Sequence, residues 1–193
     1  MALVLITPPA LEPLTVAQAR AHLRVDTTDD DVVIEELIRA ARQRAEDCTG
    51  RALGQQTWEL LLADFPTRGS PIDLPKPPNP SITSLTYIDP SGVSTVMPST
   101  DYEIVPGSVL SRLTPVYGKT WPDTLRREAC VKIRYQTGYI QVPAPILSWM
   151  KLLVGTLYDH RETVLRGETA TASFLPSGVS DSLIDPYIVP SLA

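Results

Sequence analysis

Proline is the residue that most restricts how this chain can fold. The 193 residues include 19 prolines, and those from Pro66 to Pro122 punctuate the central third of the chain. This total is about twice the usual share of roughly 5%. Proline cannot donate to a strand ladder and it breaks helix interiors. The central region must therefore consist of short strands, edge strands and turns.

Alternating apolar and polar residues in this region predict β-strands. The alternation is clear at residues 56–62 and at residues 131–135. Between them, Asp89-Pro90-Ser91-Gly92 has the Asp, Pro and Gly positions of a type I turn. Short alternating runs bounded by turns are typical of antiparallel structure. We expect an inserted antiparallel β-rich region at residues 55–142.

Helical periodicity predicts helices before and after this region. Thr15 and Gln18 form a capping-box pattern for a short first helix. A second helix is expected from about Asp30 to Thr49, with Gly50 as its stop. Its apolar residues recur at helical spacing and are expected to be core: Ile34, Leu37, Ile38, Ala41, Ala45 and Cys48.

These patterns predict an α+β fold: a small helical core of three main helices, the inserted antiparallel β domain and an extended C-terminal tail. Residues 1–54 are assigned to the N-terminal helices of the core and residues 143–162 to the core helix. From Ile146 to Tyr158 this third helix is apolar on almost every face, so it must be covered on every face. We expect a subunit interface there, involving Trp149 and Leu153.

Residues 163–193 have the composition of a spacer followed by an apolar patch. Thr163 to Gly178 is rich in small and polar residues. The patch that follows is a candidate docking site for a partner protein, through Leu183, Ile184, Pro186, Tyr187 and Ile188. A tail that folds back on its own domain explains the same composition equally well, and both interpretations stay open.

Motifs for catalysis and for metal or nucleotide binding are missing from the sequence. There is no P-loop, dinucleotide-binding fingerprint, nucleophile elbow or zincin motif. The histidines, His22 and His160, suit ordinary helix positions, although a small hydrolase built on His160 is one alternative. The acidic run Asp29–Asp31 lacks the spacing of a calcium loop and suits a helix N-terminus. We expect no enzyme activity, no cofactor and no metal.

The charge balance and the apolar runs restrict the remaining classes. A net charge of −5 argues against a protein that grips DNA phosphates. The alternative function is a nucleic-acid-binding module that uses a basic cluster on the β domain: Arg126, Arg127, Lys132 and Arg134. The apolar N-terminus lacks a basic flank and stops at Pro8-Pro9, so it does not resemble a signal peptide. We expect a soluble intracellular protein with two free thiols and no membrane segment.

Several sequence blocks together resemble the head–tail connector (adaptor) family of long-tailed DNA phages. The resemblance begins at LTVAQARAHLRVD and DDDVVIEELIRAARQRAEDCTGRAL, and continues through IDLPKPPNPSITSLTYIDPSG, PVYGKTWP and VKIRYQTGY. It extends through VPAPILSWMKLLVGTLYDHRE and ends at SLIDPY. It covers nearly the whole chain in order, but the segment Thr169 to Ser173 has no counterpart in it.

The resemblance implies a structural role in a virion. It implies a homo-oligomeric ring of about a dozen subunits below the portal vertex. Such a ring extends the DNA channel, and its partners are the portal protein and a head-closure or tail-completion protein. DNA passes through without sequence-specific binding, and assembly takes place in the host cytoplasm. It also implies that terminal segments reach the portal.

Overall fold

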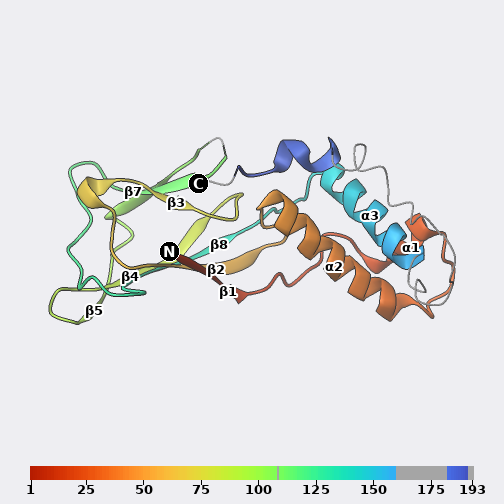
Figure 1. Cartoon of the computed structure of the whole chain (residues 1–193), viewed down its shortest axis with the longest axis horizontal. Coiled ribbons are helices and arrows are strands. Elements are labelled where there is room, and N and C mark those ends of the chain that lie inside the picture. The colour runs from red at the N-terminus through yellow and green to blue at the C-terminus, as the bar shows by residue number, and fades with distance from the viewer. Residues whose placement is uncertain (108, 160–181, 191–193) are drawn as a thin grey trace, which may run out of the picture. The chain divides into compact units, whose positions relative to one another are not determined.

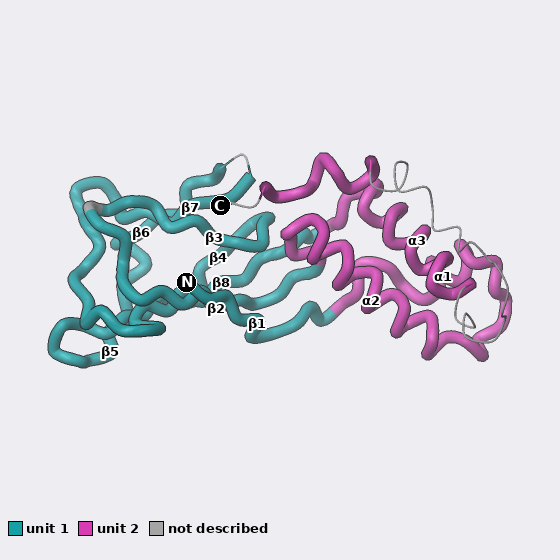
Figure 2. Tube along the Cα trace, viewed as in Figure 1, with its two compact units in different colours: residues 1–10, 54–140 teal, residues 11–53, 141–193 magenta. Residues whose placement is uncertain are grey.

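The computed structural model describes residues 1–107, 109–159 and 182–190. It contains helices and antiparallel sheets, which confirms the predicted α+β class (Figure 1). The chain divides into two units, and each unit is built from two separate segments (Figure 2). Unit 1 comprises Met1–Ala10 and Gly54–Ile140, and unit 2 comprises Leu11–Leu53 and Gln141–Ala193.

The strands of unit 1 form two antiparallel sheets. The order in the five-stranded sheet is β1 (Ala2–Thr7), β2 (Gln56–Leu62), β8 (Val131–Thr137), β4 (Ser81–Ile88) and β5 (Ser94–Val96). The three-stranded sheet has the order β3 (Ile72–Leu74), β7 (Ser111–Pro115) and β6 (Tyr102–Val105). A short 3-10 turn, η1 (Thr67–Gly69), lies between β2 and β3 in the chain.

Strand β1 differs from the sequence expectation. Residues 1–54 were assigned to the helical core, whereas the structure places residues 1–10 in unit 1. Strand β1 pairs with β2, where Leu3 lies opposite Leu60 and Val4 opposite Glu59. A short apolar run cannot be distinguished as strand or helix by periodicity alone. The partner strand begins only at Gln56, so no local signal marks this pairing.

One buried cluster draws side chains from both sheets and forms the core of unit 1. The five-stranded sheet contributes Leu60, Leu85 and Ile133, and the three-stranded sheet contributes Ile72 and Leu113. Strand β8 shows the alternation that the sequence predicted, with every second side chain buried from Val131 to Thr137. Burial of apolar area of this kind is the main force that holds two sheets together.

Unit 2 is built on three mutually contacting helices: α1 (Val16–Leu23), α2 (Asp31–Thr49) and α3 (Ala144–Asp159). The predicted capping box of α1 is present, because Thr15 and Gln18 exchange side-chain to backbone hydrogen bonds. Helix α2 ends at Gly50, which has φ +71° and donates its N–H to the carbonyl of Glu46. A positive φ suits glycine because it has no Cβ to clash.

The predicted core stripe of α2 is largely correct. Ile34, Ile38, Ala41 and Ala45 are buried. Leu37 is only half-buried, so its inclusion in the fully buried stripe was wrong. Leu37 directly precedes Ile38, so it lies about 100° around the helix from the centre of the stripe. Cys48 is partly buried and Cys130 is buried, and neither forms a disulfide.

A network of ion pairs and hydrogen bonds joins α2 to residues before and after it in unit 2. Arg42 contacts Glu12 through Nε and Glu46 through an NH group, both at 2.8 Å. The second oxygen of Glu46 accepts the backbone N–H of Leu53 at 2.8 Å. The three side chains of this ion-pair network are mostly buried, so each charge is stabilised by the others in place of water.

Within the described residues, none of the helices combines the length and apolar character that a membrane span requires.

Candidate functional site

The predicted docking patch lies at the C-terminal end of α2 in unit 2. Residues 182–190 include a short 3-10 turn, η2 (Asp185–Tyr187). The N–H of Val189 donates to the carbonyl oxygen of Thr49 at 2.8 Å. Arg51 donates from Nε to the carbonyl oxygen of Tyr187. The carbonyl of Thr49 is at the end of α2, where the last carbonyl groups have no partner within the helix. The bond from Val189 supplies that partner, and the bond from Arg51 holds Tyr187 beside it.

The residues of this patch differ in exposure. Ile184 is 4% exposed and holds the segment in the subunit, whereas Ile188 is 44% exposed. Leu183 and Tyr187 are half-buried, and Pro186 is exposed. For residues 182–190, the structure therefore has the folded-back arrangement that was one of the two open interpretations. The expected spacer, Thr163 to Gly178, lies outside the described residues.

The expected interface helix, α3, is buried on one side only. Ile146, Trp149, Met150 and Val154 form its buried stripe, and Trp149 is 8% exposed. Leu153 is half-buried and Leu157 is 38% exposed, one turn further along the helix. Trp149 packs inside the chain, and Leu153 and Leu157 follow it at steps of four residues, which keeps all three on one face of the helix. The exposure on this face increases toward the end of α3 at Asp159.

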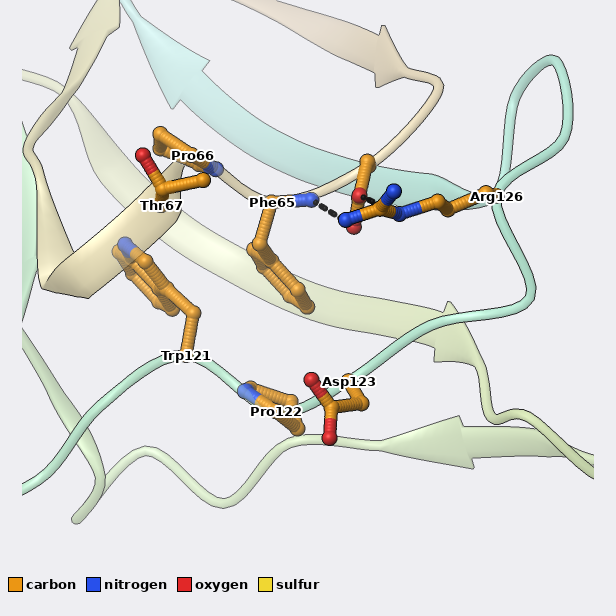
Figure 3. Close-up of a pocket in the computed structure, with 8 residues that line it drawn as sticks. Phe65, Pro66, Thr67, Trp121, Pro122, Asp123 and Arg126 are labelled. Carbon is orange, nitrogen blue, oxygen red and sulfur yellow. Dashed lines mark hydrogen bonds and ion pairs between the residues drawn. The ribbon is translucent and has the colours of Figure 1, made fainter.

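Unit 1 has a small cavity of about 320 Å³ between the loop after β2 and the loop before β8 (Figure 3). Phe65 and Trp121 stack along it, with parallel rings and centroids 4.9 Å apart. Asp64 accepts hydrogen bonds from Thr124 Oγ1 at 2.6 Å and from the N–H of Phe65 at 2.8 Å. Its second oxygen lies 2.9 Å from Nε of Arg126.

The polar groups around this cavity are used to join its two loops. Trp121 donates from Nε1 to the carbonyl oxygen of Ser70 at 2.9 Å, and Asp64 satisfies three donors. A general acid or base needs a titratable group free to meet a substrate. The carboxylate of Asp64 is committed to structural contacts, so the arrangement links loops and offers no evident catalytic pair.

The candidate basic cluster on the β domain is partly neutralised. Arg134 contacts Glu59 through two nitrogens, at 2.7 and 3.0 Å, and Arg126 pairs with Asp64. Arg127 and Lys132 are exposed. Phosphate binding depends on cations that are available to replace counterions. With two guanidinium groups paired to carboxylates, this surface is a weak candidate for nucleic-acid binding.

The remaining candidate residues are the two histidines and the acidic run Asp29–Asp31. His22 is exposed in the last turn of α1, and His160 lies outside the described residues. Among the acidic run, Asp30 accepts a hydrogen bond from the hydroxyl of Tyr158, and Asp31 lies 3.5 Å from Arg20. The part of the chain that the structure describes contains no group of three or more His, Cys, Asp or Glu residues placed to hold a metal ion.

Sequence reasoning missed β1, one of the two outer strands of the five-stranded sheet; the other outer strand, β5, lies within the alternating run Val93 to Met97 that follows the predicted turn. Both expose apolar side chains, including Val4 and Val96. The available signal was the uncharged run Ala2–Thr7 before Pro8-Pro9. It was considered only as a possible signal peptide, because its strand partner is distant in the sequence.

Comparison with known proteins gives both a sequence match and a fold match. Residues 13–87 match the family described as phage gp6-like head-tail connector protein. A chain of the structure entitled "Neck of empty GTA particle computed with C6 symmetry" has a TM-score of 0.78 and 24% identity to this chain. A chain of "Virion of native gene transfer agent (GTA) particle" gives 0.77 and 24%. Both matches cover 100% of this chain and 98% of the other.

A further similar chain belongs to "Neck of native GTA particle computed with C12 symmetry", with a TM-score of 0.74 and 24% identity, and the same coverage of both chains. No curated protein sequence matches the chain. At this identity the structural matches establish the fold over the full length. The resemblance seen in the sequence is therefore confirmed: residues 13–87 carry the signature of the phage gp6-like head-tail connector family.

Proposed function

We propose that this chain is a structural head–tail connector subunit of a tailed phage or phage-like particle. In this role it forms a ring below the portal vertex, extends the DNA channel and joins the capsid to the tail. The role is one of assembly, and it requires binding surfaces in place of a catalytic site.

One combined observation carries this proposal. The connector-family match at residues 13–87 lies in a chain whose fold matches chains of particle-neck structures along its whole length. Those neck structures were computed with C6 and C12 symmetry. Cyclic symmetry of this kind needs a heterologous contact, in which one surface of a subunit meets a different surface of the next.

The C-terminal end of α3, where its apolar face becomes exposed, is a proposed contact in this ring. Leu153 and Leu157 lie one turn apart on the same side of the helix, and Leu157 is exposed. Trp149 supports this contact indirectly, because its buried ring fixes the helix within unit 2. Apolar residues in the centre of an interface usually contribute most of its binding energy.

The C-terminal segment is the proposed portal contact. Ile184 and the hydrogen bond from Val189 to Thr49 hold this segment on unit 2. Pro186 and Ile188 are exposed, and with Leu183 and Tyr187 they would meet the portal. A small patch is sufficient in a ring, because many copies bind at once.

The charge of the chain suits a DNA conduit. The net charge is −5, and the guanidinium groups of Arg126 and Arg134 are paired with carboxylates. Strong phosphate contacts would slow DNA that has to slide through the channel. We infer passage of DNA without sequence-specific binding.

Deletion of the gene in the strain that produces the particles tests this function. We expect DNA-filled heads and separate tails in electron micrographs, and joined particles after the wild-type chain is supplied in trans. Leu153→Glu should fail to restore joining, whereas Val105→Glu, a change at an exposed residue of β6, should restore it. Normal tailed particles from the deletion strain would show that the chain is not the connector.

A further inference from the structure

The five-stranded sheet of unit 1 has two free edges, and both are uncharged and expose a valine. Among the described residues, no strand lies on the outer side of β1 or of β5. Val4 on β1 is 41% exposed and Val96 on β5 is 65% exposed. Neither strand contains a charged residue or a proline. Natural proteins usually protect a free edge with charged residues or prolines, since an exposed edge pairs readily with another strand.

The strand register shows that both valines lie on the same face of the sheet. Val4 is opposite Glu59, which is opposite Arg134 on the central strand β8. From the other edge, Val96 is opposite Thr86, which is opposite Lys132 on β8. Directly opposed residues share a face, and so do residues two apart on one strand. This outer face is therefore charged at its centre and has an exposed valine at each of its two edges.

The topology also makes the two edges compatible with one another. Four successive antiparallel pairings separate β1 from β5, so the two edge strands run in the same direction. A second copy, related by a small rotation about a ring axis, would present its β5 to β1 in a parallel orientation. A contact between two different edges is heterologous, and it closes into a ring when the rotation closes.

We propose that β1 of one subunit docks beside β5 of the next copy of this chain, with Val4 against Val96. The partner is a second copy because the two edges share strand direction, lack of charge and an exposed valine on the same face. β5 has three residues, and parallel pairing is slightly weaker than antiparallel pairing. Each contact is therefore weak, and ring closure supplies the avidity. This inference rests on the ring in the proposed function and identifies one of its contacts.

Disulfide trapping tests the contact in the full chain. Cys48→Ser removes the partly buried native thiol, and Cys130 is buried. Val4→Cys and Val96→Cys are then introduced together and oxidised under mild conditions. A disulfide needs Cβ atoms about 3.5–4.5 Å apart. We expect a ladder of linked subunits on a non-reducing gel, and a single dimer band when the two single variants are mixed.

The controls distinguish this arrangement from others. Val105→Cys paired with Val96→Cys should give no ladder, because Val105, 43% exposed, lies on β6 in the other sheet. Val4→Cys alone should give no dimer; a dimer would indicate that β1 meets β1 and would overturn the proposal. Mass photometry of the wild-type chain, alone and with its portal, reports ring formation independently. Rings without a ladder refute the edge contact and leave the proposed function intact. Absence of both rings and ladder refutes both.

Discussion

Ile184 offers a direct test of where the C-terminal segment lies. Replacement of Ile184 by Ala removes a side chain that is 4% exposed, while Ile188, four residues later, is 44% exposed. If the segment packs on unit 2, Ile184→Ala must destabilise the subunit, and Ile188→Ala must have little effect. If the segment is a free tail, both substitutions leave the stability unchanged.

The size of the effect follows from the buried area. An isoleucine loses three carbon atoms on replacement by alanine, and each buried methylene is worth about 0.8 kcal/mol. The residual cavity adds to this, and large-to-small core changes cost about 2–5 kcal/mol in total. A peripheral segment can partly close the gap, so we expect a loss of about 2–3 kcal/mol. Ile188→Ala should cost less than about 1 kcal/mol, because much of that side chain is already in water.

Thermal and urea melts followed by circular dichroism measure this difference. For a chain of this size, a loss of about 2–3 kcal/mol corresponds to a decrease in Tm of roughly 4–12 °C. The helical signal reports unit 2, whose helices are α1, α2 and α3. Equal melting curves for Ile184→Ala and the wild type would refute the packing of this segment on α2.

Three further predictions concern the interior of the subunit. Ile38→Ala should lower the free energy of unfolding in urea melts by about 2–5 kcal/mol. Leu37→Ala should lower it clearly less, because Leu37 is only half-buried. Equal losses for the two variants would contradict the orientation of α2. Arg42→Ala should cost on the order of 3 kcal/mol because it removes the cation that lies between two mostly buried carboxylates. Arg39→Ala, the control in an exposed pair, should cost less than about 1 kcal/mol. Burial raises the pKa of Tyr135 above that of an unfolded tyrosine, because the folded state favours the neutral phenol. The stability that Tyr135 provides is therefore complete below pH about 10 and decreases at higher pH, where the unfolded state loses this proton first. Ultraviolet titration should show one tyrosine that ionises last, and Tyr135→Phe should remove that step.

The sequence was most informative where the signal is local. The capping box at Thr15 and Gln18, the stop at Gly50 and the apolar stripe of α2 each depend on neighbouring residues, and each is present. The alternation in β8 was equally readable, because burial on one face imposes a period of two. These elements required no knowledge of distant partners.

The features that sequence reasoning missed depend on distant contacts. Strand β1 pairs with residues at least 50 positions away, and Val189 meets Thr49 across 140 positions. Trp149 lies on a helix that is apolar almost all round, so the sequence could not show which side was covered from within the chain. The same limit applied to the C-terminal patch, whose composition suits an internal or an external partner.

The division of the chain into interleaved segments has a consequence for synthesis. Strand β1 emerges first, but its sheet lacks the central strand β8 until residue 137 has been made. Likewise α1 and α2 precede strands β2 to β8, and α3 follows them. A nascent chain on the ribosome therefore has unit 1 complete only after Ile140, and the three helices of unit 2 only after Asp159. The two free edges of the complete sheet come into existence only once β8 has been made, which delays their encounter with other copies until after that point.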